Sequence, residues 1–97
     1  MKITFEFYER DDLSFDINKS SVTIGKSADC DIHLDIDGFS RKHCQIDVVG
    51  EEIFVTDLNS TNGVEINEER IKAGEKTLFH VFLPLRIGPT KSVDIKI

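Results

Sequence analysis

The sequence predicts an all-β fold, an antiparallel β-sandwich or barrel made of many short strands. Apolar and polar residues alternate through most of the chain, which places apolar side chains on one face of each predicted strand. Clusters of Gly, Pro, Asn, Asp and Ser separate these runs at short intervals. No window has the length and the period of about 3.6 residues expected of a helix.

The predicted strands follow one another closely from the first residues to the last. In the first half, the alternating apolar sets are Ile3, Phe5 and Phe7, then Leu13, Phe15 and Ile17, then Val22 and Ile24, then Cys44, Ile46 and Val48. In the second half they are Ile53 and Val55, then Val64 and Ile66, then Val81, Leu83, Leu85 and Ile87, then Val93, Ile95 and Ile97. Turn signals occur at residues 10–12, 18–20, 37–38, 50–52, 59–63, 73–75 and 88–90.

Pro84 interrupts the alternating run from Val81 to Ile87. Because proline has no N–H to donate to a sheet ladder, we expect this strand at a sheet edge or with a bulge. In the alternative interpretation, residues 79–83 are irregular and the strand begins after Pro84.

The composition is that of one folded globular domain. The chain has 97 residues, of which 39% are hydrophobic and 31% charged, so we expect a single domain over residues 1–97. The formal net charge of −6 disfavours binding to DNA, RNA or an anionic membrane. No apolar stretch approaches the roughly 20 residues of a membrane helix, and residues 1–7 alternate like a strand rather than a signal peptide. We therefore expect a cytoplasmic protein without direct membrane insertion, whose oligomeric state stays open.

The two cysteines, Cys30 and Cys44, are expected to be free and buried, because a disulfide scaffold usually has more than one bridge. They can be combined with His33 and His43 into a hypothetical metal site, but the spacing matches no zinc pattern. We expect neither a metal nor a cofactor.

Three short polar clusters follow or precede predicted strands. They are Gly25-Lys26-Ser27, Ser40-Arg41-Lys42-His43 and Ser60-Thr61-Asn62-Gly63. If the folded sheet brings these loops to one end, they combine cations, hydroxyls, an amide and turn backbone, which are groups that hold a phosphate.

Each cluster has an ordinary structural explanation beside the functional one. Asn62-Gly63 is a common tight turn, but a fixed turn also points the Asn62 carboxamide outward, toward an extended ligand. The segment around Ser40 is either a solvated basic loop or a phosphate contact, in which the Ser40 hydroxyl donates and Arg41 supplies charge.

Two enzymatic interpretations fit the clusters poorly. Ser40 and His43 have no evident third group to orient the histidine and no glycine-framed nucleophile turn, so we expect no hydrolase and no catalytic residue. Gly25-Lys26-Ser27 looks like the end of a Walker A loop, but Ser20 stands where the first glycine belongs and no helix follows.

In order and spacing, the motifs together resemble the forkhead-associated (FHA) domain family. The resemblance covers residues 22–67 densely and continues loosely through residues 87–89. Its segments are Ile24-Gly25-Lys26, Asp29-Cys30-Asp31-Ile32, Ser40-Arg41-Lys42-His43, residues 57–63, and Ile66-Asn67. The resemblance implies a β-sandwich of about eleven strands whose loops at one end bind phosphothreonine peptides.

The resemblance also implies roles for single residues. Positions that contact the phosphate or the peptide main chain are matched by Lys26, Ser40, Arg41, Thr61 and Asn62. Positions that shape the loops are matched by Gly25, His43 and Gly63. The chain departs from the family pattern at Lys26, where arginine is usual, and at Glu68, where glycine is common. Lysine keeps the charge but loses the bidentate fork of arginine.

The predicted function is therefore phosphothreonine-dependent binding of a peptide or protein in signalling, without catalysis. The alternative is an interaction or scaffold module on the same fold that is indifferent to phosphate. Lys26 and the negative net charge favour this alternative, because an acidic body repels an anionic ligand at long range.

Overall fold

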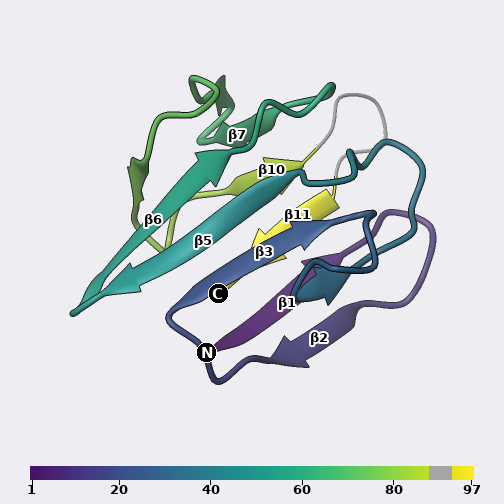
Figure 1. Cartoon of the computed structure of the whole chain (residues 1–97), viewed down its shortest axis with the longest axis horizontal. Coiled ribbons are helices and arrows are strands. Elements are labelled where there is room, and N and C mark those ends of the chain that lie inside the picture. Colours follow the sequence, from purple (N-terminus) through teal and green to yellow (C-terminus); the bar gives the residue numbers. More distant parts are fainter. Residues whose placement is uncertain (88–92) are drawn as a thin grey trace.

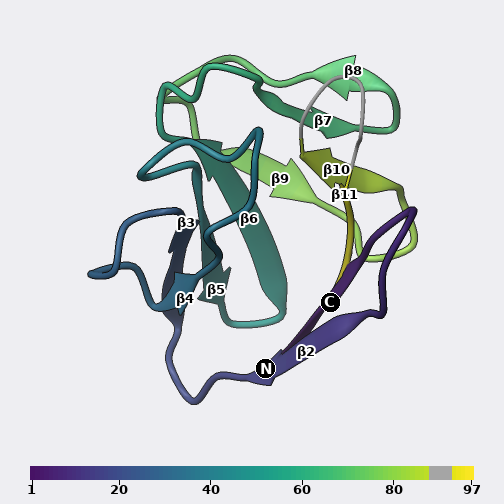
Figure 2. The same ribbon diagram turned by 90° about the vertical axis from the view of Figure 1, so that its right-hand side faces the viewer.

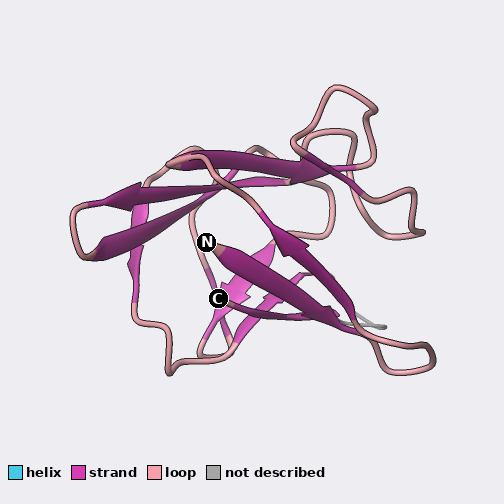
Figure 3. Ribbon diagram, turned by 90° about the horizontal axis from the view of Figure 1, so that it is seen from below, coloured by secondary structure: helices cyan, strands magenta, loops and turns pink. Residues whose placement is uncertain are grey.

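The computed structural model describes residues 1–87 and 93–97, and within them the chain forms an all-β sandwich of eleven strands (Figure 1). One sheet contains β1 (Lys2–Glu6), β2 (Leu13–Asp16), β7 (Val64–Ile66), β8 (Glu69–Arg70), β10 (Leu85–Ile87) and β11 (Val93–Lys96). The other contains β3 (Ser21–Gly25), β4 (Ile32–His33), β5 (Cys44–Val49), β6 (Glu52–Asp57) and β9 (Thr77–Phe79). Figure 2 shows the two sheets facing each other, and Figure 3 shows only strands and loops in the described part. The predicted fold class is confirmed.

The strand order places the ends of the sequence in one sheet, and the three polar clusters lie next to β3, β5 and β6 of the other. The first sheet has the order β2-β1-β11-β10-β7-β8 and the second the order β4-β3-β5-β6-β9. Most neighbours are antiparallel, and β3 and β4 pair in parallel. In this way β11 at the end of the chain lies beside β1, with Phe5 opposite Ile95.

The core lies between the two sheets and consists of the alternating apolar residues. Burial of an apolar side chain of this size contributes about 1.5–3 kcal/mol, so the alternation decides which face of each strand turns inward. Ile3 and Phe5 of one sheet and Ile24 and Ile46 of the other are fully buried. The remaining members of the core are Val22, Ile32, Leu34, Phe39, Cys44, Val55, Val64, Phe79, Leu85, Ile87, Val93 and Ile95.

The region before Pro84 differs from the first of the two interpretations. A strand beginning at Val81 is wrong, because the Leu83 N–H donates to the His80 carbonyl and closes a turn, while Val81 and Phe82 are exposed. The next strand, β10, begins at Leu85, as the alternative interpretation predicts. That alternative is wrong at Phe79, which ends β9 and is buried. The predicted turn at residues 88–90 lies outside the described residues.

Three short strands escaped the alternation pattern altogether. β4 and β8 have two residues each, too few to show a period, and in β9 the apolar residues Leu78 and Phe79 are adjacent and do not alternate. The turn between β7 and β8 consists of Asn67 and Glu68, both with positive φ, at 53° and 68°. This is the two-residue turn that best matches the twist of a hairpin, although its second position normally favours glycine.

Candidate functional site

Three neighbouring strands bring the three polar clusters to one end of the second sheet. Ile24 of β3 lies opposite Cys44 of β5, which lies opposite Asp57 of β6. The first cluster directly follows this row along the chain, the second precedes it and the third follows it. In Figure 1, β3 and β6 run toward the upper right of the view, and β5 runs in the opposite direction. The expectation that the sheet gathers these loops is confirmed.

The first two loops are joined through their backbones. The Lys26 N–H donates to the Ser40 carbonyl and the Ser27 N–H to the Arg41 carbonyl, each at 2.9 Å. This close approach explains Gly25, because a Cβ at that position would lie 2.3 Å from the Arg41 carbonyl oxygen. A side chain there would push the Ser40 loop away from β3.

His43 joins the second loop to the third. Its side chain is fully buried, and Nδ1 accepts a hydrogen bond from the Ser40 N–H at 3.0 Å. The proton of the neutral ring therefore sits on Nε2, which donates to the Gly63 carbonyl at 2.8 Å. Burial lowers the pKa of His43 below its ordinary value of 6.5, partly offset by the Gly63 hydrogen bond. His43 therefore contacts both the Ser40 loop and the Gly63 loop through its two ring nitrogens.

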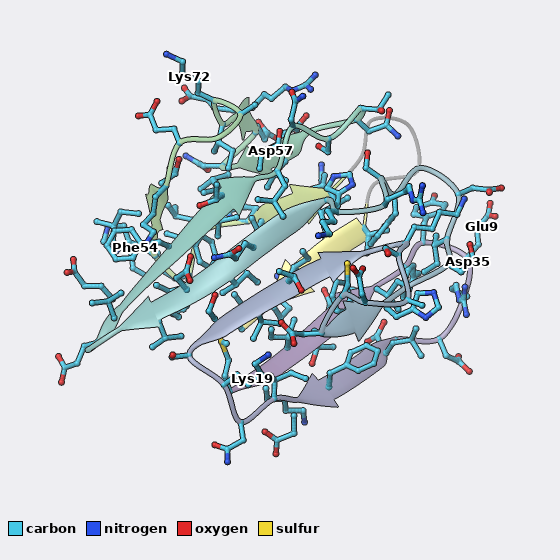
Figure 4. All side chains as sticks on the ribbon, viewed as in Figure 1. Glu9, Lys19, Asp35, Phe54, Asp57 and Lys72 are labelled. Atoms are coloured by element: carbon cyan, nitrogen blue, oxygen red, sulfur yellow. The ribbon has the colours of Figure 1, made fainter. Side chains whose placement is uncertain are left out.

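Asp57 and Ser60 hold the third loop from inside. Both are buried, and the Ser60 N–H donates to Asp57 Oδ1 while the Gly63 N–H donates to Ser60 Oγ, both at 2.9 Å. Gly63 has a φ of 82°, and a Cβ there would lie 2.4 Å from Arg70 Nε. Asp57 stands at the end of β6 (Figure 4). The sequence analysis named Asp57 and Ser60 only as members of longer motifs and did not predict this support of the loop; the available signal was Asp followed three residues later by Ser, typical of a side-chain-capped turn.

Ser40, Thr61 and Asn62 meet where the second and third loops touch. The Thr61 N–H donates to Ser40 Oγ at 2.9 Å, so this oxygen is an acceptor within the protein and its own proton can be donated elsewhere. Asn62 Nδ2 donates to the Gly38 carbonyl at 2.7 Å. That bond uses one amide proton and leaves the second proton and Oδ1 for another partner. Thr61 is exposed, and Ser40 and Asn62 are half-buried.

The cations of the clusters are on the surface, and two of them face carboxylates. Lys26 Nζ lies 3.8 Å from Asp35 Oδ1, and Lys42 Nζ lies 3.9 Å from Asp29 Oδ2. The hydrogen bond from the Ser27 hydroxyl lowers the pKa of Asp29, and the positive charge of Lys42 lowers it further. Arg41 is exposed and has no carboxylate within 4 Å among the residues that the structure describes.

The two cysteines are free and buried, as predicted. Cys30 Sγ lies 3.3 Å from the Arg41 carbonyl, and burial raises the pKa values of both thiols. Within residues 1–87 and 93–97, no three His, Cys, Asp or Glu side chains gather into a group able to hold a metal ion. No helix in this part of the chain is long and apolar enough to span a membrane.

Comparison with known families identifies the domain. The model of the FHA domain matches residues 22–88, which is more than half of the chain. The chain belongs to the FHA family. The matched range contains all three polar clusters and every residue to which the resemblance assigned a role.

Individual FHA proteins are similar to this chain in sequence and in structure. The FHA domain-containing protein FhaB of Mycobacterium tuberculosis is 30% identical over 74 residues, which is 76% of this chain and 46% of that protein. The solved structure of M. tuberculosis EmbR in complex with a low affinity phosphopeptide aligns with a TM-score of 0.73 and 25% identity, covering 99% of this chain and 24% of EmbR. The N-terminal FHA domain of S. cerevisiae Rad53, solved with a phosphothreonine peptide, has a TM-score of 0.73 and 20% identity, with 100% and 94% coverage. The chain spans less than half the length of the curated relatives it matches.

Proposed function

We propose that this FHA domain binds threonine-phosphorylated peptides or proteins as an interaction module in signalling, without catalysing a reaction. The proposed contact residues are Lys26, Ser40, Arg41, Thr61 and Asn62. Two structurally similar FHA proteins, EmbR and Rad53, were solved with a phosphopeptide and a phosphothreonine peptide respectively, which supports this class of ligand.

The observation that carries the proposal is the position of the Ser40 hydroxyl. Ser40 Oγ accepts a hydrogen bond from the Thr61 N–H, and the Ser40 backbone N–H donates to His43 Nδ1. Both the side chain and the backbone of Ser40 are therefore fixed. The hydroxyl proton is the group that remains for a ligand, and a phosphate oxygen is a strong acceptor for it. A fixed donor of this kind favours binding because little ordering is needed when the ligand arrives.

The charge of a phosphothreonine fits the cations at the edge of this site. The phosphate carries about −1.5 to −2 charge and three acceptor oxygens at pH 7. Lys26 and Arg41 flank Ser40, since the Lys26 N–H bonds the Ser40 carbonyl and Arg41 follows Ser40 in the chain. Hydrogen bonds to a charged group contribute about 1.5–3 kcal/mol each, which supports micromolar binding, about −8 kcal/mol, after peptide ordering is subtracted.

The absence of catalysis is proposed on the geometry of His43. Both ring nitrogens are bound to backbone groups, Nδ1 to the Ser40 N–H and Nε2 to the Gly63 carbonyl. Neither nitrogen is free to take a proton from the Ser40 hydroxyl, so the pair lacks the relation between nucleophile and base that a serine hydrolase needs.

We also propose that residues 1–97 form one domain in the cytoplasm. β1 and β11 lie side by side in one sheet, so the two ends of the chain belong to a single folded unit. The cytoplasmic location is supported by two free thiols in a small domain, where secreted proteins of this size usually carry disulfides.

The proposal is tested by titrating the domain with phosphothreonine peptides and with the same peptides lacking the phosphate. We expect micromolar binding to a subset of the phosphorylated peptides, weak binding of their phosphoserine counterparts and no binding of the unphosphorylated ones. Affinity should fall below about pH 6, where the phosphate loses charge. Equal affinity for phosphorylated and unphosphorylated peptides contradicts the proposal.

The alternative is a module that binds a protein partner regardless of phosphate, and one observation favours it. Leu78, Val81 and Phe82 are exposed at 42%, 52% and 82%, and they lie in or directly after β9, an edge strand. Since β9 runs antiparallel to β6, Phe82 follows the end of the sheet remote from Ser40. Such a module would keep its partner after phosphatase treatment.

A further inference from the structure

The ion pair between Lys26 and Asp35 is built into the edge of the second sheet. β4 pairs in parallel with β3, with His33 opposite Gly25, and the Leu34 N–H donates to the Gly25 carbonyl at 2.9 Å. Lys26 directly follows Gly25 at the end of β3, and Asp35 directly follows Leu34, just beyond the end of β4. Figure 4 shows Asp35 beyond the end of β3, on the right of the view.

We propose that Asp35 competes with the ligand phosphate for Lys26, and that the domain therefore selects phosphothreonine ligands carrying a basic residue near the phosphate. This inference rests on the proposed function. In the free domain Lys26 forms an ion pair with Asp35. In the complex Lys26 binds the phosphate instead, and the basic residue of the ligand forms an ion pair with Asp35.

The geometry of the pair favours such an exchange. The N–O separation of 3.8 Å is too long for a hydrogen bond, so Lys26 is attracted to Asp35 but not fixed by it. Asp35 is 75% exposed and Lys26 39% exposed, so both can be reached by a ligand. Pairs of this kind stabilise a protein little, which means that a dianionic phosphate can displace the carboxylate.

Two earlier acidic residues of this segment, Asp29 and Asp31, have other partners. Asp31 accepts hydrogen bonds from Lys19 at 2.6 Å and from the Thr23 N–H at 2.9 Å. Asp29 accepts from the Ser27 hydroxyl and faces Lys42. Asp35 lies within 4 Å of Lys26, a proposed phosphate contact, so its charge opposes phosphate binding directly.

After the exchange, an unpaired Asp35 would lie beside the phosphate. Both negative groups would then lie next to Lys26, and charges that close repel each other even in water. The net charge of −6 adds to this repulsion at long range. A lysine or arginine of the ligand removes the repulsion by pairing with Asp35. This gives the acidic domain a reason to prefer a ligand that is not uniformly negative.

The inference is tested with two sets of phosphothreonine peptides that differ in one feature. The first has only neutral residues around the phosphothreonine, and the second carries a single lysine moved through the flanking positions. Affinities are measured for the wild type, for Asp35→Asn and for Glu51→Gln. The last variant changes the net charge equally in the β5–β6 hairpin, at the other end of the sheet.

For the wild type we expect the best lysine peptide to bind about two- to fivefold more tightly than the neutral peptide, the value of an exposed ion pair. Asp35→Asn should bind the neutral peptide about two- to fivefold more tightly than the wild type and should lose the preference for lysine. Glu51→Gln should retain the wild-type preference. These differences should shrink in about 0.5 M salt, which screens exposed charges.

An unchanged lysine preference in Asp35→Asn, or an equal loss of preference in Glu51→Gln, overturns the role of Asp35. In both cases phosphate-dependent binding by the wild type leaves the proposed function standing. If the wild type binds phosphorylated and unphosphorylated peptides equally, the proposed function and this inference fail together.

Discussion

Replacing His43 by alanine should separate the second and third loops and destabilise the whole domain. The substitution removes the acceptor of the Ser40 N–H and the donor to the Gly63 carbonyl, and it empties a fully buried site. Each buried group left without a partner costs about 1–3 kcal/mol, and loss of the ring's packing on Phe39 adds to this. We expect a loss of about 3–5 kcal/mol, a large part of the roughly 5–15 kcal/mol that stabilises a domain.

The assay is urea denaturation followed by circular dichroism, since the chain has no tryptophan. His33→Ala is the matched control because His33 is an exposed histidine of β4, and it should change stability by less than about 0.5 kcal/mol. His43→Asn offers an acceptor near the position of Nδ1, and His43→Gln offers a donor near that of Nε2. Both should therefore lie between the wild type and His43→Ala. Stability of His43→Ala within about 0.5 kcal/mol of the wild type would refute the role of His43 as a bridge between loops.

Four further predictions follow from single residues. Ser40→Ala should weaken phosphopeptide binding about ten- to hundredfold without unfolding the domain, because one hydrogen bond to a charged group is lost; unchanged affinity would refute the assignment of Ser40. Gly25→Ala should destabilise the domain by about 1–3 kcal/mol in denaturation, because the new Cβ meets the Arg41 carbonyl oxygen; wild-type stability would show that the loop yields freely. Glu68→Gly should stabilise the domain by about 0.5–1 kcal/mol, because a φ of 68° strains a residue with a Cβ; a loss of stability would contradict this. The free energy of unfolding should also decrease as the pH is lowered below about 6.5. Burial lowers the pKa of His43 in the folded state, so the unfolded chain binds the proton at a higher pH than the folded one. The stabilisation is fully present above pH 6.5, and His43→Gln should lack this part of the pH dependence.

The fold class could be predicted from the sequence because alternation decides which residues are buried. Ile3, Phe5, Val22, Ile24 and Ile46 are spaced by two within their runs and all are buried in the core. The pattern failed where a strand was too short to show a period, as in β4 and β8. It also failed at Val81, which continues the alternation but lies in an exposed turn closed by the Leu83 N–H.

The candidate site was predictable to the extent that its chemistry is local. Loop residues such as Ser40 and Asn62 stand in motifs with characteristic neighbours, and the resemblance to the FHA family pointed to them. Asp57 and Ser60 were missed as loop supports, since their burial depends on how β6 packs. Asp35 was missed because its contact with Lys26 depends on the parallel pairing of β4 with β3, which no turn signal indicates. Contacts between separate loops therefore required the structure.

The central claim, phosphate-dependent binding by the loops at one end of the sheet, is tested most directly by NMR. The amide signals of the labelled domain are followed during titration with a phosphothreonine peptide and with its unphosphorylated counterpart. We expect the phosphopeptide to shift the signals of Lys26, Ser40, Arg41, Thr61 and Asn62, and the unphosphorylated peptide to shift none of them. Equal shifts with both peptides, or shifts confined to β9 and residues 80–83, would contradict the account and favour a module indifferent to phosphate.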